Sequence, residues 1–216
     1  MSSRIMRPAG LEAIERETRA LGFSMASELE TGVLLRTLAA LKPAGAFLEL
    51  GTGTGIGTAW ILGGMDSASR LATVDSEAKY VAVARRHLGR DPRVRFHVEQ
   101  GEAFLHRLRG SEFDLIFADT WPGKFNHLED ALELLRTGGF YVVDDLLPQV
   151  NWPEGHAPKV AALISALERN ANLVLGRLMW SSGIIVATRR LKGAAKLISD
   201  SSAPVVAITS VPRRAR

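Results

Sequence analysis

The stretch Phe47-Leu-Glu-Leu-Gly-Thr-Gly-Thr-Gly-Ile-Gly57 decides the fold of this chain of 216 residues. It begins as an apolar run with one carboxylate, Glu49, and continues with a glycine at every second position. Glycines that follow a strand remove the Cβ atoms that would keep a ligand away from the backbone. Because the residues from Thr58 to Leu62 then start a helix, the stretch predicts a strand, a ligand-binding turn and a helix in succession.

The kind of ligand follows from spacing and charge. The next apolar strand ends at Asp75, whose carboxylate can accept hydrogen bonds from both hydroxyls of a ribose. A dinucleotide site requires the spacing G-x-G-x-x-G, but Ile56 or Thr58 stands where the third glycine belongs. Glu49 would repel a pyrophosphate, whereas it can hold the α-ammonium of a methionine-bearing cofactor. We therefore expect S-adenosylmethionine rather than NAD; the alternative is a turn with a purely structural role.

The composition predicts one catalytic domain without disulfides. With 46% hydrophobic residues, the chain is long enough for one well-buried core and short for two. The absence of cysteine excludes disulfides, thiolate metal sites and cysteine nucleophiles. No apolar run is long enough to span a bilayer, and no apolar leader follows Met1, so we expect a cytoplasmic protein without membrane contact.

Charge is uneven along the chain. The net charge is only +4, and basic residues such as Arg213 and Arg214 gather near the C-terminal end. We expect a solvated basic tail over residues 191–216 rather than a contact with nucleic acid or membrane. The expected organisation is a set of N-terminal helices that cover the cofactor site (1–45), a catalytic core (46–190) and this tail.

Apolar runs that alternate with helical stretches predict a parallel sheet covered on both faces. The expected strands are residues 46–50, 71–75, 94–98, 113–118 and 140–143. The expected helices are residues 11–21, 28–41, 77–88, 102–108 and 128–135. This pattern is typical of a Rossmann-like, doubly wound α/β fold.

The last part of the core departs from the alternation. A proline-rich loop, residues 147–158, precedes a predicted helix over 159–168. Two apolar runs, 173–178 and 184–188, are joined by a short serine and glycine turn and predict an antiparallel pair at the sheet edge. These two strands complete a sheet of seven. Further along, 205–209 is a candidate strand with no obvious place in the sheet.

Carboxylates follow the ends of several predicted strands, where open parallel sheets bind their ligands. Asp119 and the pair Asp144-Asp145 end two neighbouring strands. Three carboxylates on one rim repel one another unless a cation lies among them, and a hard divalent metal ion is the natural partner. The alternative is that these aspartates cap turns and accept backbone hydrogen bonds.

Taken in order, these segments resemble the class I S-adenosylmethionine-dependent methyltransferases and, within them, the catechol O-methyltransferase-like group. The resemblance extends from about Ser24 to Arg190. It rests on five segments, residues 48–55, 73–75, 100–103, 113–119 and 135–145. It implies a methyltransferase fold and methyl transfer to a hydroxyl group of a small acceptor.

The resemblance also implies roles for individual residues. The residues expected to contact or flank the cofactor are Met25, Glu49, Gly51, Gly53, Asp75, Glu102, Ala103 and Asp119. In metal-dependent members, the positions of Asp119, Asp144 and Asp145 ligate Mg²⁺ or a similar divalent ion. A lysine three residues after the first aspartate helps to deprotonate the acceptor in those members. Here Pro122 stands at that position, and Lys124 follows two residues later.

The acceptor hydroxyl must lose its proton to a metal-assisted step or to a general base. Asp119, Lys124 and His156 are the residues expected to act in catalysis, with His127 as a further candidate base; solvated or loop-ordering roles are the alternatives. The aromatic residues of loop 149–156 suit a planar, aromatic acceptor.

The sequence leaves open two other functions and the possibility that the chain forms a homodimer. The first function is methylation of tRNA, although no RNA-binding motif lies inside the domain, so a nucleic-acid partner is not expected. The second is a cofactor-binding module without catalysis, which the missing lysine at residue 122 would explain. A homodimer is also left open.

Overall fold

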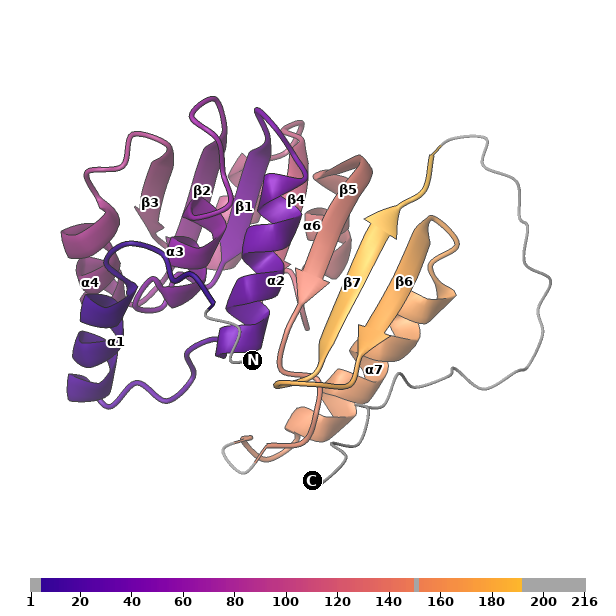
Figure 1. Ribbon diagram of the computed structural model, residues 1–216. Helices are drawn as coiled ribbons and strands as arrows, with labels where there is room; N and C mark the ends of the chain where they lie inside the picture. Colours follow the sequence, from indigo (N-terminus) through magenta and orange to yellow (C-terminus); the bar gives the residue numbers. More distant parts are fainter. Residues whose placement is uncertain (1–4, 150–151, 192–216) are drawn as a thin grey trace, which may run out of the picture.

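The computed structural model describes residues 5–149 and 152–191. The strands are β1 (Ala46–Leu50), β2 (Arg70–Asp75), β3 (Val94–Val98), β4 (Phe113–Ala118), β5 (Leu135–Val143), β6 (Leu173–Leu178) and β7 (Ile184–Arg189). They form one sheet in the order β3-β2-β1-β4-β5-β7-β6 (Figure 1). The first five strands are parallel, and β7 runs antiparallel to both β5 and β6. The predicted doubly wound sheet with an antiparallel last pair is confirmed.

Helices cover both faces of this sheet (Figure 1). They are α1 (Leu11–Ala20), α2 (Leu29–Ala40), α3 (Ile56–Leu62), α4 (Ala78–Leu88), α5 (Gly101–Arg107), α6 (Leu128–Glu133) and α7 (His156–Arg169). Helices α1 to α4 share one apolar cluster with the sheet, and α5 to α7 share the other. Within the part of the chain that the structure describes, none of these helices has both the length and the apolar composition of a membrane span.

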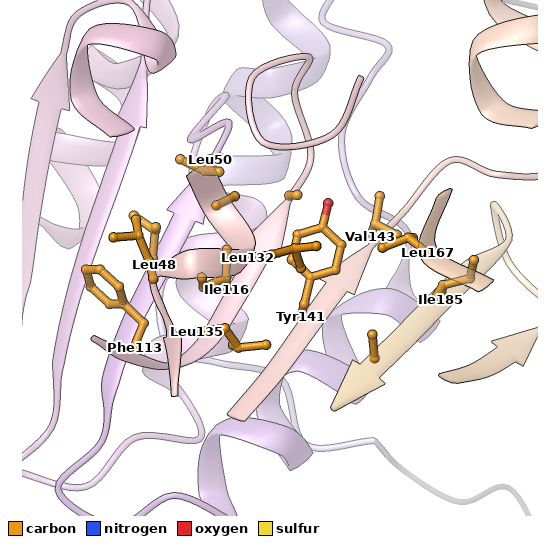
Figure 2. Close-up of a cluster of buried hydrophobic side chains, with 14 of the residues drawn as sticks. Leu48, Leu50, Phe113, Ile116, Leu132, Leu135, Tyr141, Val143, Leu167 and Ile185 are labelled. Carbon is orange, nitrogen blue, oxygen red and sulfur yellow. The ribbon is translucent and has the colours of Figure 1, made fainter. Parts of the chain in front are cut away.

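The apolar cluster beneath α5, α6 and α7 contains the hydroxyl group of Tyr141, which connects the sheet to a loop. Figure 2 shows Tyr141 of β5 among apolar side chains such as Ile116 and Leu132. The Tyr141 hydroxyl is fully buried and donates a hydrogen bond to the carbonyl oxygen of Gly123 at 2.6 Å. Because a buried hydroxyl is costly without a partner, this bond fixes the loop after β4 to the sheet.

Helix α7 begins three residues before the predicted helix over 159–168, so the prediction of a loop up to residue 158 was wrong. Pro158 is the third residue of α7, where backbone N–H groups have no partner within the helix and none is lost. Gly155 precedes the helix with φ 76. As a consequence, His156 stands on the first turn of a helix and is positioned more firmly than a loop residue would be.

Strand β5 begins at Leu135 rather than at residue 140, and α6 ends at Glu133 rather than at 135. The glycines at 138 and 139 resemble a turn in the sequence. In the structure the strand continues through them, and its pairing with β4 shifts register between Phe113 and Leu115. The candidate strand 205–209 and nearly all of the predicted basic tail lie outside the described residues.

Candidate active site

A cavity of about 390 Å³ lies at the carboxyl ends of the central strands. Loops after β1, β2, β4 and β5 line it, together with the segment between α1 and α2 and the start of α7. Open parallel sheets bind ligands at this place, where the strand order reverses. The predicted site residues found in the lining are Met25, Gly51, Gly53, Asp75, Asp119, Lys124, Asp144, Asp145 and His156. Glu49, Glu102 and Ala103 lie outside it.

The turn after β1 is held by Asp75 at the end of β2. The Oδ2 atom of Asp75 accepts a hydrogen bond from the backbone N–H of Gly53 at 2.8 Å, and its Oδ1 accepts one from Glu77 at 2.9 Å. Gly51 has φ 104, and a Cβ there would lie 2.9 Å from the carbonyl oxygen of Asp119. Only glycine allows the end of β1 to pass this close to the end of β4. Each Asp75 oxygen keeps a second lone pair that can accept a ribose hydroxyl.

Glu49 lies in β1, beneath the floor of the cavity, and is fully buried. Its Oε2 accepts hydrogen bonds from the hydroxyls of Thr58 at 2.5 Å and Thr73 at 2.6 Å. Its Oε1 has no hydrogen-bond partner among the described residues and faces Gly57, where a Cβ would approach it to 2.5 Å. Burial raises the pKa of Glu49 to about 7. A buried acceptor without a partner fits a cationic ligand group close by.

We expect Glu49 to make the protein less stable as the pH rises. Between pH 4.5 and 7 the folded protein holds this proton and the unfolded chain does not. The free energy of unfolding should therefore fall by about 3 kcal/mol across this window. Urea unfolding at both ends of the window measures the change.

The variant Glu49→Gln has no proton to lose and should lack this part of the pH dependence. Its control is Glu12→Gln, at an exposed position of α1, which should behave as the wild type. Equal pH slopes for the wild type and Glu49→Gln would contradict the assignment of a raised pKa to this buried carboxyl group.

Three residues predicted to flank the cofactor differ in their position relative to the cavity. Met25 lines the cavity, whereas Glu102 and Ala103 start α5 outside the lining. Phe23 and Tyr80 also line the cavity, with ring centroids 4.5 Å apart, and the sequence prediction missed them. No local pattern signals this aromatic pair, because its members come from the α1–α2 segment and from α4.

Asp119 and Asp144 form an acidic pair in the wall of the cavity. Asp119 accepts a hydrogen bond from the hydroxyl of Ser27 at 3.2 Å. Asp144 is buried and accepts hydrogen bonds from the Ser182 hydroxyl and from the backbone N–H of Asp145, the latter at 2.6 Å. Burial raises the pKa of both carboxyl groups, and the charge of Asp144 raises the pKa of Asp119 further. The pair therefore favours a cation close by.

Asp145 turns away from this pair, with a left-handed φ of 64. Its Oδ1 accepts hydrogen bonds from Gln149 and Trp152, each at 2.9 Å, and its Oδ2 lies 3.6 Å from Nε2 of His156. In the described ranges, the three predicted carboxylate ligands do not offer oxygens that all lie within 4.8 Å of one another. The residues present in this cavity therefore do not fit a divalent ion held by three carboxylates.

Lys124 enters the cavity even though Pro122 occupies the position expected for a lysine. The Lys124 residue is only 4% exposed, and its Nζ lies 5.0 Å from the centroid of the Phe125 ring. Burial raises the pKa values of Asp119 and Asp144, and the positive charge of Lys124 partly offsets this rise. The alternative of a solvated lysine at the start of a helix is excluded.

His156 is a buried, unpaired histidine beside the Asp145 carboxylate. It is 5% exposed, and neither ring nitrogen has a hydrogen-bond partner within the described part of the chain. Its ring packs edge-on against Phe125, with centroids 5.0 Å apart, and lies 4.6 Å from the Trp152 ring. Burial lowers the pKa of His156 below 6.5, so the imidazole is neutral at pH 7. A neutral imidazole in a cavity can accept a proton.

His127, the rival candidate base, lies outside the cavity lining. It precedes α6, and its Nδ1 lies 2.8 Å from Oδ2 of Asp130. Together with His106 these residues form the one group of three close potential metal ligands found in residues 5–149 and 152–191. The structure therefore does not place His127 where it could act on a molecule in the cavity.

Sequence comparisons relate the chain to methyltransferases. Residues 48–146 match a family model described as a methyltransferase domain. A provisionally assigned O-methyltransferase of Mycolicibacterium vanbaalenii is 36% identical over 117 residues, and the probable O-methyltransferase of Mycobacterium tuberculosis H37Rv is 35% identical over 117 residues. Each match covers 52% of this chain and 52% of the relative. The chain thus spans about half the length of the curated relatives it matches.

Solved structures share the fold over more of the chain. The O-methyltransferase from Bacillus cereus, in complex with SAH, has a TM-score of 0.76 at 20% identity and covers 87% of this chain and 93% of its own. TomG from Streptomyces achromogenes is an O-methyltransferase involved in tomaymycin synthesis, and its structure was solved with SAM. It has a TM-score of 0.77 at 23% identity, and the match covers 88% of this chain and 93% of TomG. Residues 48–146 are therefore similar to a methyltransferase domain, and the chain shares the fold of these solved O-methyltransferases.

Proposed function

We propose that the chain transfers a methyl group from S-adenosylmethionine to a hydroxyl group of a small aromatic acceptor. The observation that carries this proposal is the position of His156. Its neutral, unpaired imidazole lines the same cavity as the glycine turn after β1. One cavity thus combines residues suited to the cofactor with a group suited to take a proton from the acceptor.

The cofactor half of the cavity fits S-adenosylmethionine. Asp75 presents acceptor oxygens for a ribose, and the unpartnered Oε1 of Glu49, which lies behind the cavity-lining Gly57, favours a ligand with an ammonium group. The lining also contains more carboxylates than cationic side chains, which favours a ligand with positive charge. When bound, this cofactor supplies a methyl group on a positively charged sulfur.

The acceptor half has aromatic walls. Trp121, Phe125 and Trp152 all line the cavity, and the rings of Trp121 and Phe125 meet edge-on with centroids 6.0 Å apart. Flat ligands pack well against such surfaces, because aromatic rings pair by stacking or by edge-to-face contact. These walls support an aromatic acceptor rather than an aliphatic one.

The chain's own residues then move the proton. As the acceptor oxygen attacks the methyl group, Nδ1 of His156 accepts the hydroxyl proton, and Asp145 stabilises the imidazolium from the Nε2 side. Bound S-adenosylmethionine would supply the methyl group to this oxygen and would leave as S-adenosylhomocysteine. The products are a methyl ether, S-adenosylhomocysteine and one proton. The protein contributes orientation, since an in-line displacement requires aligned partners.

A panel of acceptors tests this function. The full chain is incubated with S-adenosylmethionine and with phenols, catechols, aliphatic alcohols, aromatic amines or tRNA, and products are identified by mass spectrometry. We expect methylated phenols or catechols together with an equal amount of S-adenosylhomocysteine. Methylation confined to amines, aliphatic alcohols or tRNA, or no methylation of any acceptor, would contradict the proposal.

A further inference from the structure

We infer that the Lys124 ammonium is the resident cation of the acceptor half and stands where a divalent metal ion was expected. The inference rests on the proposed function, because it assigns the charge that stabilises the acceptor oxygen. It begins from a juxtaposition: the cavity wall combines the carboxylates of Asp119 and Asp144 with a lysine that is 4% exposed.

The conformation of the loop after β4 places the Lys124 side chain in the cavity. Gly123 has φ 84, and its N–H donates a hydrogen bond to the carbonyl oxygen of Asn126 at 2.8 Å. The Gly123 carbonyl accepts the bond from the buried Tyr141 hydroxyl at 2.6 Å, and a Cβ on Gly123 would lie 2.3 Å from a methyl group of Leu50. The loop is therefore pressed onto the end of β1, and Lys124 follows directly with its side chain in the cavity.

The Lys124 ammonium is not held by a single carboxylate. It lies over the face of Phe125, 5.0 Å from the ring centroid. In the described ranges no ion pair ties Nζ to a carboxylate, although its charge acts on both Asp119 and Asp144. A lysine ammonium has three N–H donors and no acceptor, so it can donate to an incoming oxygen while it offsets the acidic pair.

The same arrangement disfavours a divalent ion. The three carboxylates predicted as its ligands do not converge within 4.8 Å, and Asp145 uses both of its oxygens toward Gln149, Trp152 and His156. A buried ammonium beside the remaining pair repels a second cation. Lys124 is thus expected to donate to the acceptor oxygen as His156 takes its proton, which stabilises the developing negative charge.

Substitutions separate this role from a structural one. Lys124→Met keeps an unbranched side chain of nearly the same length but removes the charge, and Lys124→Arg keeps a charge. Because a preorganised donor to a developing oxyanion is lost, Lys124→Met should lower kcat by about 10²-fold with unchanged affinity for S-adenosylhomocysteine. Lys124→Arg should recover part of this loss. Wild-type activity should be indifferent to a chelator.

A Mn²⁺ titration followed by electron paramagnetic resonance tests the inference without any turnover, so that its failure is distinct from failure of the proposed function. We expect equally weak Mn²⁺ binding in the wild type, Lys124→Arg and Asp144→Asn. Lys124→Met leaves the acidic pair without a cation and should bind Mn²⁺ at least about tenfold more tightly than the wild type. Tight binding in the wild type that Asp144→Asn removes, or equal affinity in the wild type and Lys124→Met, would overturn the inference.

Discussion

Replacement of His156 by glutamine should lower kcat by about 10²- to 10⁴-fold, because the acceptor would lose its general base. The glutamine side chain fills similar space in the pocket between Phe125 and Trp152 but does not accept a proton at neutral pH. Affinity for S-adenosylhomocysteine should stay the same, since His156 belongs to the acceptor half. Steady-state kinetics with a phenol or catechol as the acceptor, combined with calorimetry, measures both quantities.

The matched control is His127→Gln, which changes a histidine outside the cavity lining and should keep the wild-type rate. The pH profile gives a second check. Burial lowers the pKa of His156 below 6.5, so wild-type kcat/KM should rise with pH through a value below 6.5 and then level off. A His156→Gln variant with wild-type kcat, or with the same acid limb, would contradict the role of His156.

Replacement of Asp75 by alanine should weaken cofactor binding by about 2–3 kcal/mol, or about 30- to 150-fold in Kd. The substitution removes the acceptor oxygens for the ribose. It also removes the bond that holds the N–H of Gly53 and the one that holds the N–H of Glu77, so the turn loses its support. Calorimetric titration with S-adenosylhomocysteine measures the loss.

The control for this change is Glu99→Gln, which alters a carboxylate that follows β3 and does not line the cavity. It should bind S-adenosylhomocysteine as tightly as the wild type does. Unchanged affinity in Asp75→Ala, or tight binding of NAD by the wild type, would exclude the assigned cofactor site.

The fold was largely predictable because its signals are local. The apolar run of β1 is buried along its whole length, and the glycines after it have the positive φ values that the turn requires. Asp75 ends the next strand, as predicted, and the structure adds that its carboxylate holds the turn through the N–H of Gly53. The boundaries of β5 and α7 were missed because Gly138, Gly139 and Pro158 resemble loop residues, whereas here they lie within a strand and a first helical turn.

The acceptor side was less predictable, because side-chain direction depends on distant contacts. Pro122 stands where metal-dependent relatives carry their lysine, and the sequence offered Lys124 as a catalytic candidate without a pattern that fixes where its side chain points. The Tyr141 hydroxyl, from a strand later in the chain, holds the loop in the shape that brings Lys124 into the cavity. No local sequence pattern encodes that hydrogen bond.

The same limit applies to the predicted metal ligands. Adjacent aspartates at the end of β5 suggested that both would face the rim. The left-handed φ of Asp145 turns its carboxylate toward Gln149, Trp152 and His156 instead. A backbone conformation of this kind is uncommon for a residue other than glycine, and the sequence alone does not specify it.

The central claim is that this cavity moves a methyl group from S-adenosylmethionine to an acceptor oxygen by means of the chain's own residues. Carbon-13 NMR of a reaction with cofactor labelled at the transferred methyl group, run in the presence of a chelator, tests it most directly. We predict that the label appears as an aryl methyl ether, in equal amount to S-adenosylhomocysteine, with the wild type and at a greatly reduced rate with His156→Gln. Label that stays on the cofactor, appears on nitrogen or carbon, or moves only after a divalent ion is added would contradict the account.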